Sequence, residues 1–200
     1  MGVSASACAT PTGLYLMPIA DILKHLEGFT FVGLQGNEGN VDPGHSYFSA
    51  TTIGLFNHGE IGYDDDFRGN TTYNVKLQLF DSPKRLPGSA LSVGVINCNG
   101  NYREPYVVGR HDFKDFRLHA GYWNTQGCGR LMLGADFKMF NEGTGSIEYL
   151  SGPGSITWTS LYYPINAVPG LGIFLSLGVP LDHRDGIQHA AVLLYSFKIK

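Results

Sequence analysis

The residues of this chain that could do chemistry are seven histidines, three cysteines and one run of acidic residues, Asp64–Asp66. No histidine sits in an HExxH spacing or pairs with cysteine at zinc-binding intervals. The chain contains neither a GxSxG nucleophile elbow nor a P-loop. The aspartate run lacks the pattern of an EF-hand loop, so it either attracts a cation weakly or is simply solvated. The sequence therefore predicts no enzyme, no cofactor and no metal centre.

The charges of the chain are few and nearly balanced. Charged residues make up 16% of the chain and the formal net charge is -3, whereas a typical soluble domain has about 25% charged residues. This balance gives no electrostatic reason to expect nucleic acid as a partner. Glycine is abundant, at 27 residues, and aromatic residues reach 12%. Such a composition favours a β-rich protein whose outer surface is not all water-facing.

An alternation of apolar and polar residues organises most of the chain. It is clearest in residues 73–79, 116–122 and 130–139, where every second residue is apolar and most residues between are polar or glycine. A period of two is the signature of a strand with two different faces. Clusters rich in Gly, Pro, Asn and Asp separate these segments, as tight turns require. The one segment with helical spacing is residues 19–26.

The pattern predicts about twelve strands. They are expected at residues 29–36, 46–55, 59–67, 71–81, 89–98, 105–113, 114–125, 129–140, 144–151, 155–165, 170–181 and 187–199. A tilted strand needs about 9–11 residues to cross a bilayer, and most of these have that length. We therefore expect an all-β fold, a closed antiparallel up-and-down transmembrane β-barrel over residues 29–200, preceded by an N-terminal segment, residues 1–28.

The polar face of the strands is expected to line the lumen of this barrel. It combines small residues with charges of both signs, which can pair with one another in a narrow space. The predicted lumen-lining residues are Glu60, Asp64, Asn74, Lys76, His111, Arg117, His119, Asp136, Lys138 and Glu148. The alternative is a soluble ligand-binding barrel, in which the apolar face would point inward instead.

The apolar face is expected to contact lipid, with aromatic residues near the strand ends forming interfacial girdles. The predicted girdle residues are Tyr73, Phe80, Tyr106, Phe116, Tyr122, Phe137, Tyr162, Tyr195 and Phe197. The alternating aromatics of Leu193–Phe197 also resemble the terminal strand of outer-membrane barrels. These features favour the bacterial outer membrane, with its lipid as a partner, over a soluble barrel.

The topology places Cys98 and Cys128 at the same rim of the barrel, one hairpin apart. A disulfide between them is one expectation for an oxidising compartment, and two free thiols are the other. Both termini of an even-stranded barrel lie at the opposite rim, which normally faces the periplasm.

The N-terminal residues leave three interpretations open. Residues 7–9 fit a signal-peptide cleavage site before Thr10, Cys8 fits a lipidation site, and the first residues also fit an added tag,. Residues 1–28 are then a plug, a periplasmic tail or a lipid anchor. A plug would fold into the lumen from residues 10–28.

The segment Thr12–Ala20, TGLYLMPIA, does not follow the strand pattern. It resembles the N-terminal GLxxMPxA motif of the YjbH-like outer-membrane proteins. The stretches 86–95 and 106–113 also resemble two strands of that family, although His111 stands where the family often has Lys. The resemblance implies an outer-membrane barrel linked to exopolysaccharide production, with envelope or polysaccharide-export partners.

Two functions follow from these expectations. The first is a porin-like channel for small polar solutes or ions, in which the charged luminal residues set a weak selectivity. The second is a non-conducting structural or assembly protein of the outer membrane, linked to cell-surface polysaccharide export. In the second, the lumen is filled by its own charged network or by the N-terminal segment. The short loops favour the second function, and the glycine-rich lumen favours the first.

Overall fold

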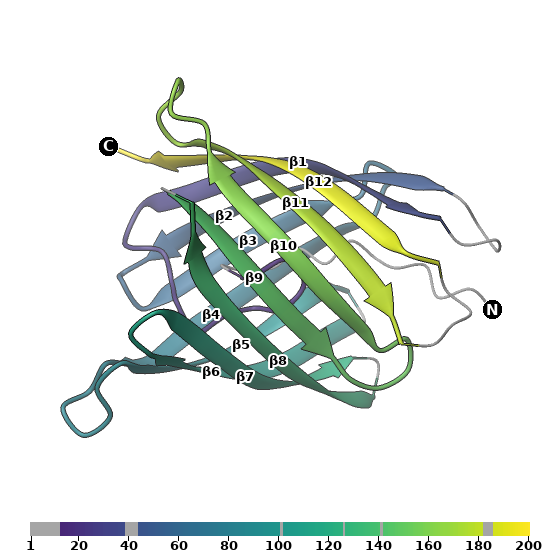
Figure 1. The fold of residues 1–200 in the computed structure, drawn as a ribbon. Helices are drawn as coiled ribbons and strands as arrows, with labels where there is room; N and C mark the ends of the chain where they lie inside the picture. The colour runs from purple at the N-terminus through teal and green to yellow at the C-terminus, as the bar shows by residue number, and fades with distance from the viewer. Residues whose placement is uncertain (1–12, 39–43, 101, 126, 141, 182–185) are drawn as a thin grey trace.

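The computed structural model describes residues 13–38, 44–100, 102–125, 127–140, 142–181 and 186–200. Twelve antiparallel strands form one closed barrel in which each strand pairs with its sequence neighbours and β1 pairs with β12 (Figure 1). The strands are β1 (Glu27–Asn37), β2 (His45–Leu55), β3 (Gly59–Asp65), β4 (Thr71–Asp81), β5 (Ser89–Asn99), β6 (Tyr102–Asp112), β7 (Phe116–Thr125), β8 (Cys128–Met139), β9 (Gly143–Leu150), β10 (Ile156–Pro164), β11 (Leu171–Pro180) and β12 (Gln188–Lys198). In the described part of the chain, no helix is long and apolar enough to cross a membrane.

The predicted barrel is confirmed. Every expected strand is present, and its ends lie within three residues of the predicted ones. The ladder between β1 and β12 is continuous from the pair Glu27–Lys198 to the pair Asn37–Gln188, so no strand edge is left open. We call the rim at which β1 starts and β12 ends the terminal rim, and the opposite one the distal rim.

The apolar face of the strands points outward. Leu77, Leu133 and Leu177 are 49%, 42% and 53% exposed, whereas their luminal neighbours Lys76 and Met132 are at most 1% exposed. In a soluble barrel the leucines would be inside, because burial of apolar surface drives folding in water. The observed inversion is the arrangement of a membrane barrel, in which lipid covers the apolar belt. The soluble alternative is therefore not supported.

A segment of the chain before β1 lies inside the barrel (Figure 1). We call residues 13–26 the luminal segment. The helix expected over residues 19–26 is wrong, since this stretch is irregular. Its backbone groups bind wall side chains instead of one another: Gln78 donates a hydrogen bond to the carbonyl of Ala20 (2.9 Å) and the amide of Leu23 donates to Glu60 (2.5 Å). These contacts replace the internal hydrogen bonds that a helix would need.

The distal half of the lumen is packed with apolar side chains. Ile96, Trp123, Met132 and Trp158 come from four different strands and are at most 3% exposed. They belong to one cluster that also includes Met17 and other residues of the luminal segment. The lumen is thus closed by a small hydrophobic core that forms between wall and segment.

Candidate functional site

The predicted luminal residues lie on the inner face of the barrel, with one exception. Glu60, Asp64, Asn74, Lys76, His119, Asp136 and Glu148 are buried there. Arg117 is partly exposed and lines an internal cavity. The inner face continues to Lys138 at the terminal rim, where this residue pairs in register with Thr144 and is exposed to solvent.

The prediction for His111 is wrong, because this residue lies on the outer face of β6 near the terminal rim. It is exposed, and its Nδ1 is hydrogen bonded to the hydroxyl of Ser89 at 2.8 Å. Its neighbour Arg110 points into the lumen and is 9% exposed. Adjacent residues of a strand face opposite sides, so only one of the two can line the lumen.

A carboxylate on β9 holds the first part of the luminal segment. Glu148 accepts hydrogen bonds from the backbone amides of Tyr15 (2.6 Å), Leu16 (2.9 Å) and Met17 (2.8 Å). The three amides converge because the chain turns here, with the amide of Leu14 bonded to the carbonyl of Met17 at 3.1 Å. Successive amides in such a turn form a concave anion-binding site. The GLYLMP sequence is therefore the part of the segment that binds Glu148.

A buried ion pair holds the middle of the luminal segment. Lys76 on β4 and Glu60 on β3 are 2.9 Å apart, and both side chains are fully buried. The ammonium group of Lys76 also donates to the backbone carbonyls of Ile19 and Asp21, and Ser92 donates to the carbonyl of Ala20 at 2.7 Å. The pair is stabilised because its remaining hydrogen-bonding capacity is used by the segment.

A second charged cluster binds the side chain of Asp21. Arg110 and Arg117, on neighbouring strands β6 and β7, both pair with this carboxylate, Arg117 at 2.8 Å. Arg117 also binds Asp136 on β8 at 2.8 Å, and Asp136 in turn contacts His119 at 2.7 Å. The cluster joins three wall strands to the luminal segment, so both arginines and both aspartates within it have partners of opposite charge.

The luminal segment reaches the terminal rim close to β2. The amide of Leu26 donates to the carbonyl of Gly54 (2.9 Å), and the amide of His25 donates to the side chain of Asn57 (2.8 Å). A Cβ atom at Gly54 would collide with the backbone carbonyls of Leu23 and Lys24. Glycine at this position thus allows the segment to lie directly against the wall.

The cysteines and acidic residues form no further site in the described part of the chain. Cys98 and Cys128 are free, so of the two alternatives the structure has the free thiols and not the disulfide. They lie on β5 and β8, which β6 and β7 separate. No group of three or more histidine, cysteine or acidic residues is placed to hold a metal ion among the described residues. Cys8, the candidate for lipidation, lies outside the described residues.

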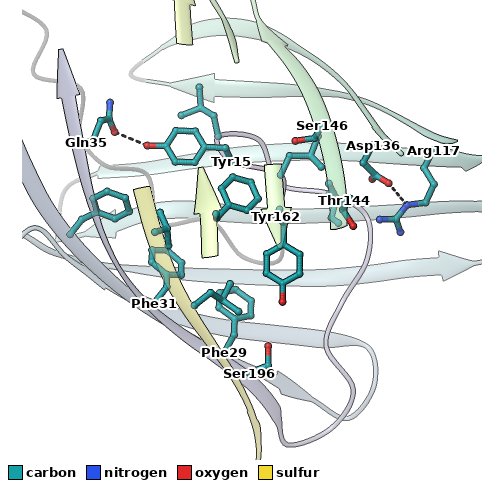
Figure 2. Close-up of a pocket in the computed structure, with 18 residues that line it drawn as sticks. Tyr15, Phe29, Phe31, Gln35, Arg117, Asp136, Thr144, Ser146, Tyr162 and Ser196 are labelled. Carbon is teal, nitrogen blue, oxygen red and sulfur yellow. Dashed lines mark hydrogen bonds and ion pairs between the residues drawn. The ribbon is translucent and has the colours of Figure 1, made fainter. Parts of the chain in front are cut away.

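An internal cavity of about 310 Å³ remains between the luminal segment and the wall. Figure 2 shows Phe29 and Phe31 on one side of it and Thr144, Ser146 and the Arg117–Asp136 pair on the other. The apolar lining continues through Phe48, Phe174, Val192 and Leu194 of the wall and Leu14, Leu16 and Ile19 of the segment. The terminal half of the lumen is therefore hollow, while the distal half is packed.

Sequence reasoning missed the aromatic content of the lumen. Tyr106 and Tyr162, expected in the lipid-facing girdles, lie inside: Tyr106 is 5% exposed, and Tyr162 lines the cavity. Trp123 and Trp158 also point inward. The alternation of side chains along each strand could have identified them, because each of the four lies two residues from another luminal residue of its strand and therefore on the same face.

Comparison with known proteins gives structural neighbours but no match by sequence. No family model matches the sequence, and no curated protein is similar to it. Two structures of the KdgM porin, one in complex with disordered oligogalacturonate, superpose with TM-scores of 0.61 and 0.60 at 12% and 14% identity. Each covers 84% of this chain and 99% of the porin chain. The Acinetobacter baumannii outer membrane protein Omp33 has a TM-score of 0.42 at 11% identity, over 88% of this chain and 100% of that one.

The chain therefore has the fold of a closed, twelve-stranded antiparallel β-barrel, as the KdgM porin does. Its lumen contains the luminal segment, which charged side chains from several wall strands hold in place.

Proposed function

We propose that the protein is an outer-membrane, porin-like barrel that is closed in the state described here, and that small polar solutes or ions pass only when the luminal segment moves. The observation that carries this proposal is the binding of the segment by the wall residues Glu148, Lys76 and Arg117 across the lumen. A channel that was permanently open would leave these wall charges to water. Here they bind an irregular segment that lies inside the barrel, where a solute would have to pass.

The fit of the outer surface to lipid supports the membrane location. The exposed belt of leucine, isoleucine and valine residues on the strands needs a hydrocarbon environment,. We expect a folded band that migrates faster than the heat-denatured one on a gel and that forms only in detergent or lipid. A monodisperse β-protein in plain buffer would refute the membrane location.

Conductance measurements distinguish a channel that is closed in this state from a barrel that never conducts. The wild-type protein in planar bilayers is expected to show rare, small openings with weak ion selectivity, because the lumen carries charges of both signs. The double variant Lys76→Met, Glu148→Gln removes two of the wall groups that bind the segment, and openings should become more frequent. If neither protein conducts although both fold, the channel proposal fails.

The second candidate is a non-conducting structural or assembly protein, and the hydrophobic core around Trp123, Met132 and Trp158 favours it. These side chains belong mainly to the wall, so they would narrow the lumen even without the segment. The resemblance of TGLYLMPIA to the YjbH-like motif points the same way, toward envelope or polysaccharide-export partners. Co-purification of export components with the wild-type barrel, but not with a variant in this motif, would support this candidate.

A further inference from the structure

We propose that the cavity of about 310 Å³ in the terminal half of the lumen is a binding site for a small, neutral, mainly apolar molecule that carries a hydroxyl group at one end. This inference does not depend on whether the barrel conducts. It rests on the shape, lining and charge balance of the cavity.

The apolar end of the cavity is built by aromatic and aliphatic side chains together. Phe29 and Phe31 of β1, Phe48 of β2 and Phe174 of β11 supply rings, and Val192 of β12 supplies a branched aliphatic group. Phe31 and Phe48 pack edge to face, with ring centroids 5.9 Å apart. A polar sugar would leave hydroxyl groups unpaired against such walls, which is costly. A hydrocarbon or aromatic body is the occupant that gains most there.

The opposite end of the cavity offers neutral hydrogen-bonding groups. Thr144 and Ser146 of β9 and Tyr162 of β10 place hydroxyl groups on the lining there, and Ser196 of β12 adds one beside Phe29, its register partner on β1 (Figure 2). Each hydroxyl can both donate and accept, so this end suits an alcohol or a phenol.

The charges next to the cavity do not favour a charged ligand. Arg117 and Asp136, the charged lining residues, bind each other at 2.8 Å. Arg117 also binds Asp21 at 2.8 Å, and Asp136 contacts His119 at 2.7 Å. A ligand carboxylate would have to displace Asp21 or Asp136 from Arg117, and a ligand ammonium would have to displace Arg117. A neutral head group disturbs neither pair.

The size of the cavity sets the size of the ligand. A volume of about 310 Å³ corresponds to roughly ten water molecules at about 30 Å³ each,. That is the lower end of the range for small-molecule pockets, roughly 300–1,000 Å³. We therefore choose para-propylphenol as the probe, with para-propylbenzoate as the charged analogue of similar shape and galactose as the polar comparator.

The test is protein-observed NMR on the refolded full chain in a deuterated detergent, with methyl groups labelled. Val192 and Leu194 line the cavity, and Leu193 between them faces lipid and is 45% exposed. We expect saturable shifts and magnetisation transfer between para-propylphenol and the methyl groups of Val192 and Leu194, without saturable effects at Leu193. Transfer to Leu193 alone would overturn the proposal, because it would report partition into the detergent. A detergent chain in contact with Val192 and Leu194 that the probe does not displace would overturn it too.

The comparators and variants test the chemistry of the site. Tighter binding of para-propylbenzoate or galactose would refute a neutral, apolar ligand class. Ser146→Phe fills the cavity and should abolish binding, whereas Thr159→Phe, on the outer face of β10, should leave it unchanged. Tyr162→Phe removes one hydroxyl without changing the fold and should weaken binding by about 2- to 10-fold, the effect of one hydrogen bond. Unchanged affinity in both Ser146→Phe and Tyr162→Phe would place the ligand elsewhere.

Discussion

The substitution Glu148→Gln tests directly how the luminal segment is held. In the wild-type protein one carboxylate oxygen accepts from the amide of Tyr15, and the other accepts from the amides of Leu16 and Met17. A glutamine side chain keeps one accepting oxygen and turns a donating NH2 group toward the remaining amide. At least one hydrogen bond is therefore lost, and the others become neutral.

The expected magnitude follows from this count. A hydrogen bond to a charged group contributes about 1.5–3 kcal/mol, and a neutral one about 0.5–1.5 kcal/mol. One lost bond and two weakened bonds amount to about 3–5 kcal/mol, and the lower cost of burying an amide than a carboxylate offsets part of this. A net loss of about 2–3 kcal/mol raises the population of the undocked turn by about 30- to 150-fold, since every 1.4 kcal/mol is a factor of ten.

Amide hydrogen exchange measures this population. Exchange of the Tyr15, Leu16 and Met17 amides should accelerate by the same factor in Glu148→Gln, because these amides exchange when the turn opens. The matched control is Glu104→Gln: Glu104 is also a buried luminal carboxylate (5% exposed), but its hydrogen bond comes from Asn97, outside the luminal segment. Equal exchange of the three amides in wild-type and Glu148→Gln protein would show that Glu148 does not hold the segment.

Three further predictions concern other parts of the barrel. Gly54→Val forces a side chain against the backbone of the luminal segment. It should lower the free energy of unfolding by about 1–3 kcal/mol, the usual cost of overpacking, as measured by urea denaturation. Cys98 and Cys128 should both react with a maleimide in the folded protein without reductant, Cys128 faster because it is more exposed, and a non-reducing gel should show no intramolecular disulfide. In the 66–70 loop of the distal rim, hydrogen bonds from the side chain and backbone of Asn70 and from one further amide hold the pKa of Asp66 below its ordinary value. The loop contacts are thus fully formed above the ordinary aspartate pKa, and they are lost as the pH falls through the lowered pKa of Asp66. An NMR titration of Asp66 should have its midpoint at this lowered pKa, and the substitution Asn70→Ala should raise the midpoint.

Each of these predictions has an outcome that contradicts it. Gly109→Ala is the control for the glycine substitution, because the nearest atom to its new Cβ lies 3.7 Å away; equal stability losses in both variants would refute a specific collision at Gly54. If both cysteines reacted with the maleimide only after reductant was added, they would be joined by a disulfide and the prediction of free thiols would be wrong. An Asp66 midpoint that does not respond to Asn70→Ala would show that another group lowers its pKa.

The sequence predicted the barrel well because lipid imposes one simple requirement on the outer face. Every second residue of a strand must be apolar, and segments such as Tyr73–Leu79 satisfy this without exception. The inner face has no such rule. In the middle of β6, Val107 and Val108 face opposite sides although both are apolar, so the pattern could not decide which face His111 occupied. The placement of Tyr106 in a girdle was wrong because it was based on the aromatic side chain alone and not on the face of β6 that Tyr106 shares with Glu104 and Arg110.

The luminal segment was harder to predict because its structure comes entirely from its partners. Residues 19–26 have helical spacing, yet Lys76, Gln78 and Ser92 take up the carbonyl groups that a helix would use. None of these wall residues is near the segment in sequence. The one local signal was the TGLYLMPIA stretch, which fitted no strand, and the structure gives it a physical role in binding Glu148.

The contacts of the luminal segment also limit how the barrel can open. Complete release would leave Glu148 beside Trp158 with no amide partners and would take Asp21 away from two arginines. Breaking a buried pair by removing one partner typically costs about 3–5 kcal/mol, so the segment contributes to the stability of the barrel itself. The turn has one charged wall partner, Glu148, beside the hydrogen bond from the Tyr15 hydroxyl to Gln35 (3.0 Å) and the packing of Met17 in the core. The stretch around Asp21 is held by three charged wall residues, Lys76, Arg110 and Arg117. In the channel proposed above, we therefore expect opening to begin with the turn, which has fewer charged wall partners. The stretch from Ile19 to Leu26 would then stay bound, and a solute would pass beside a partly displaced segment.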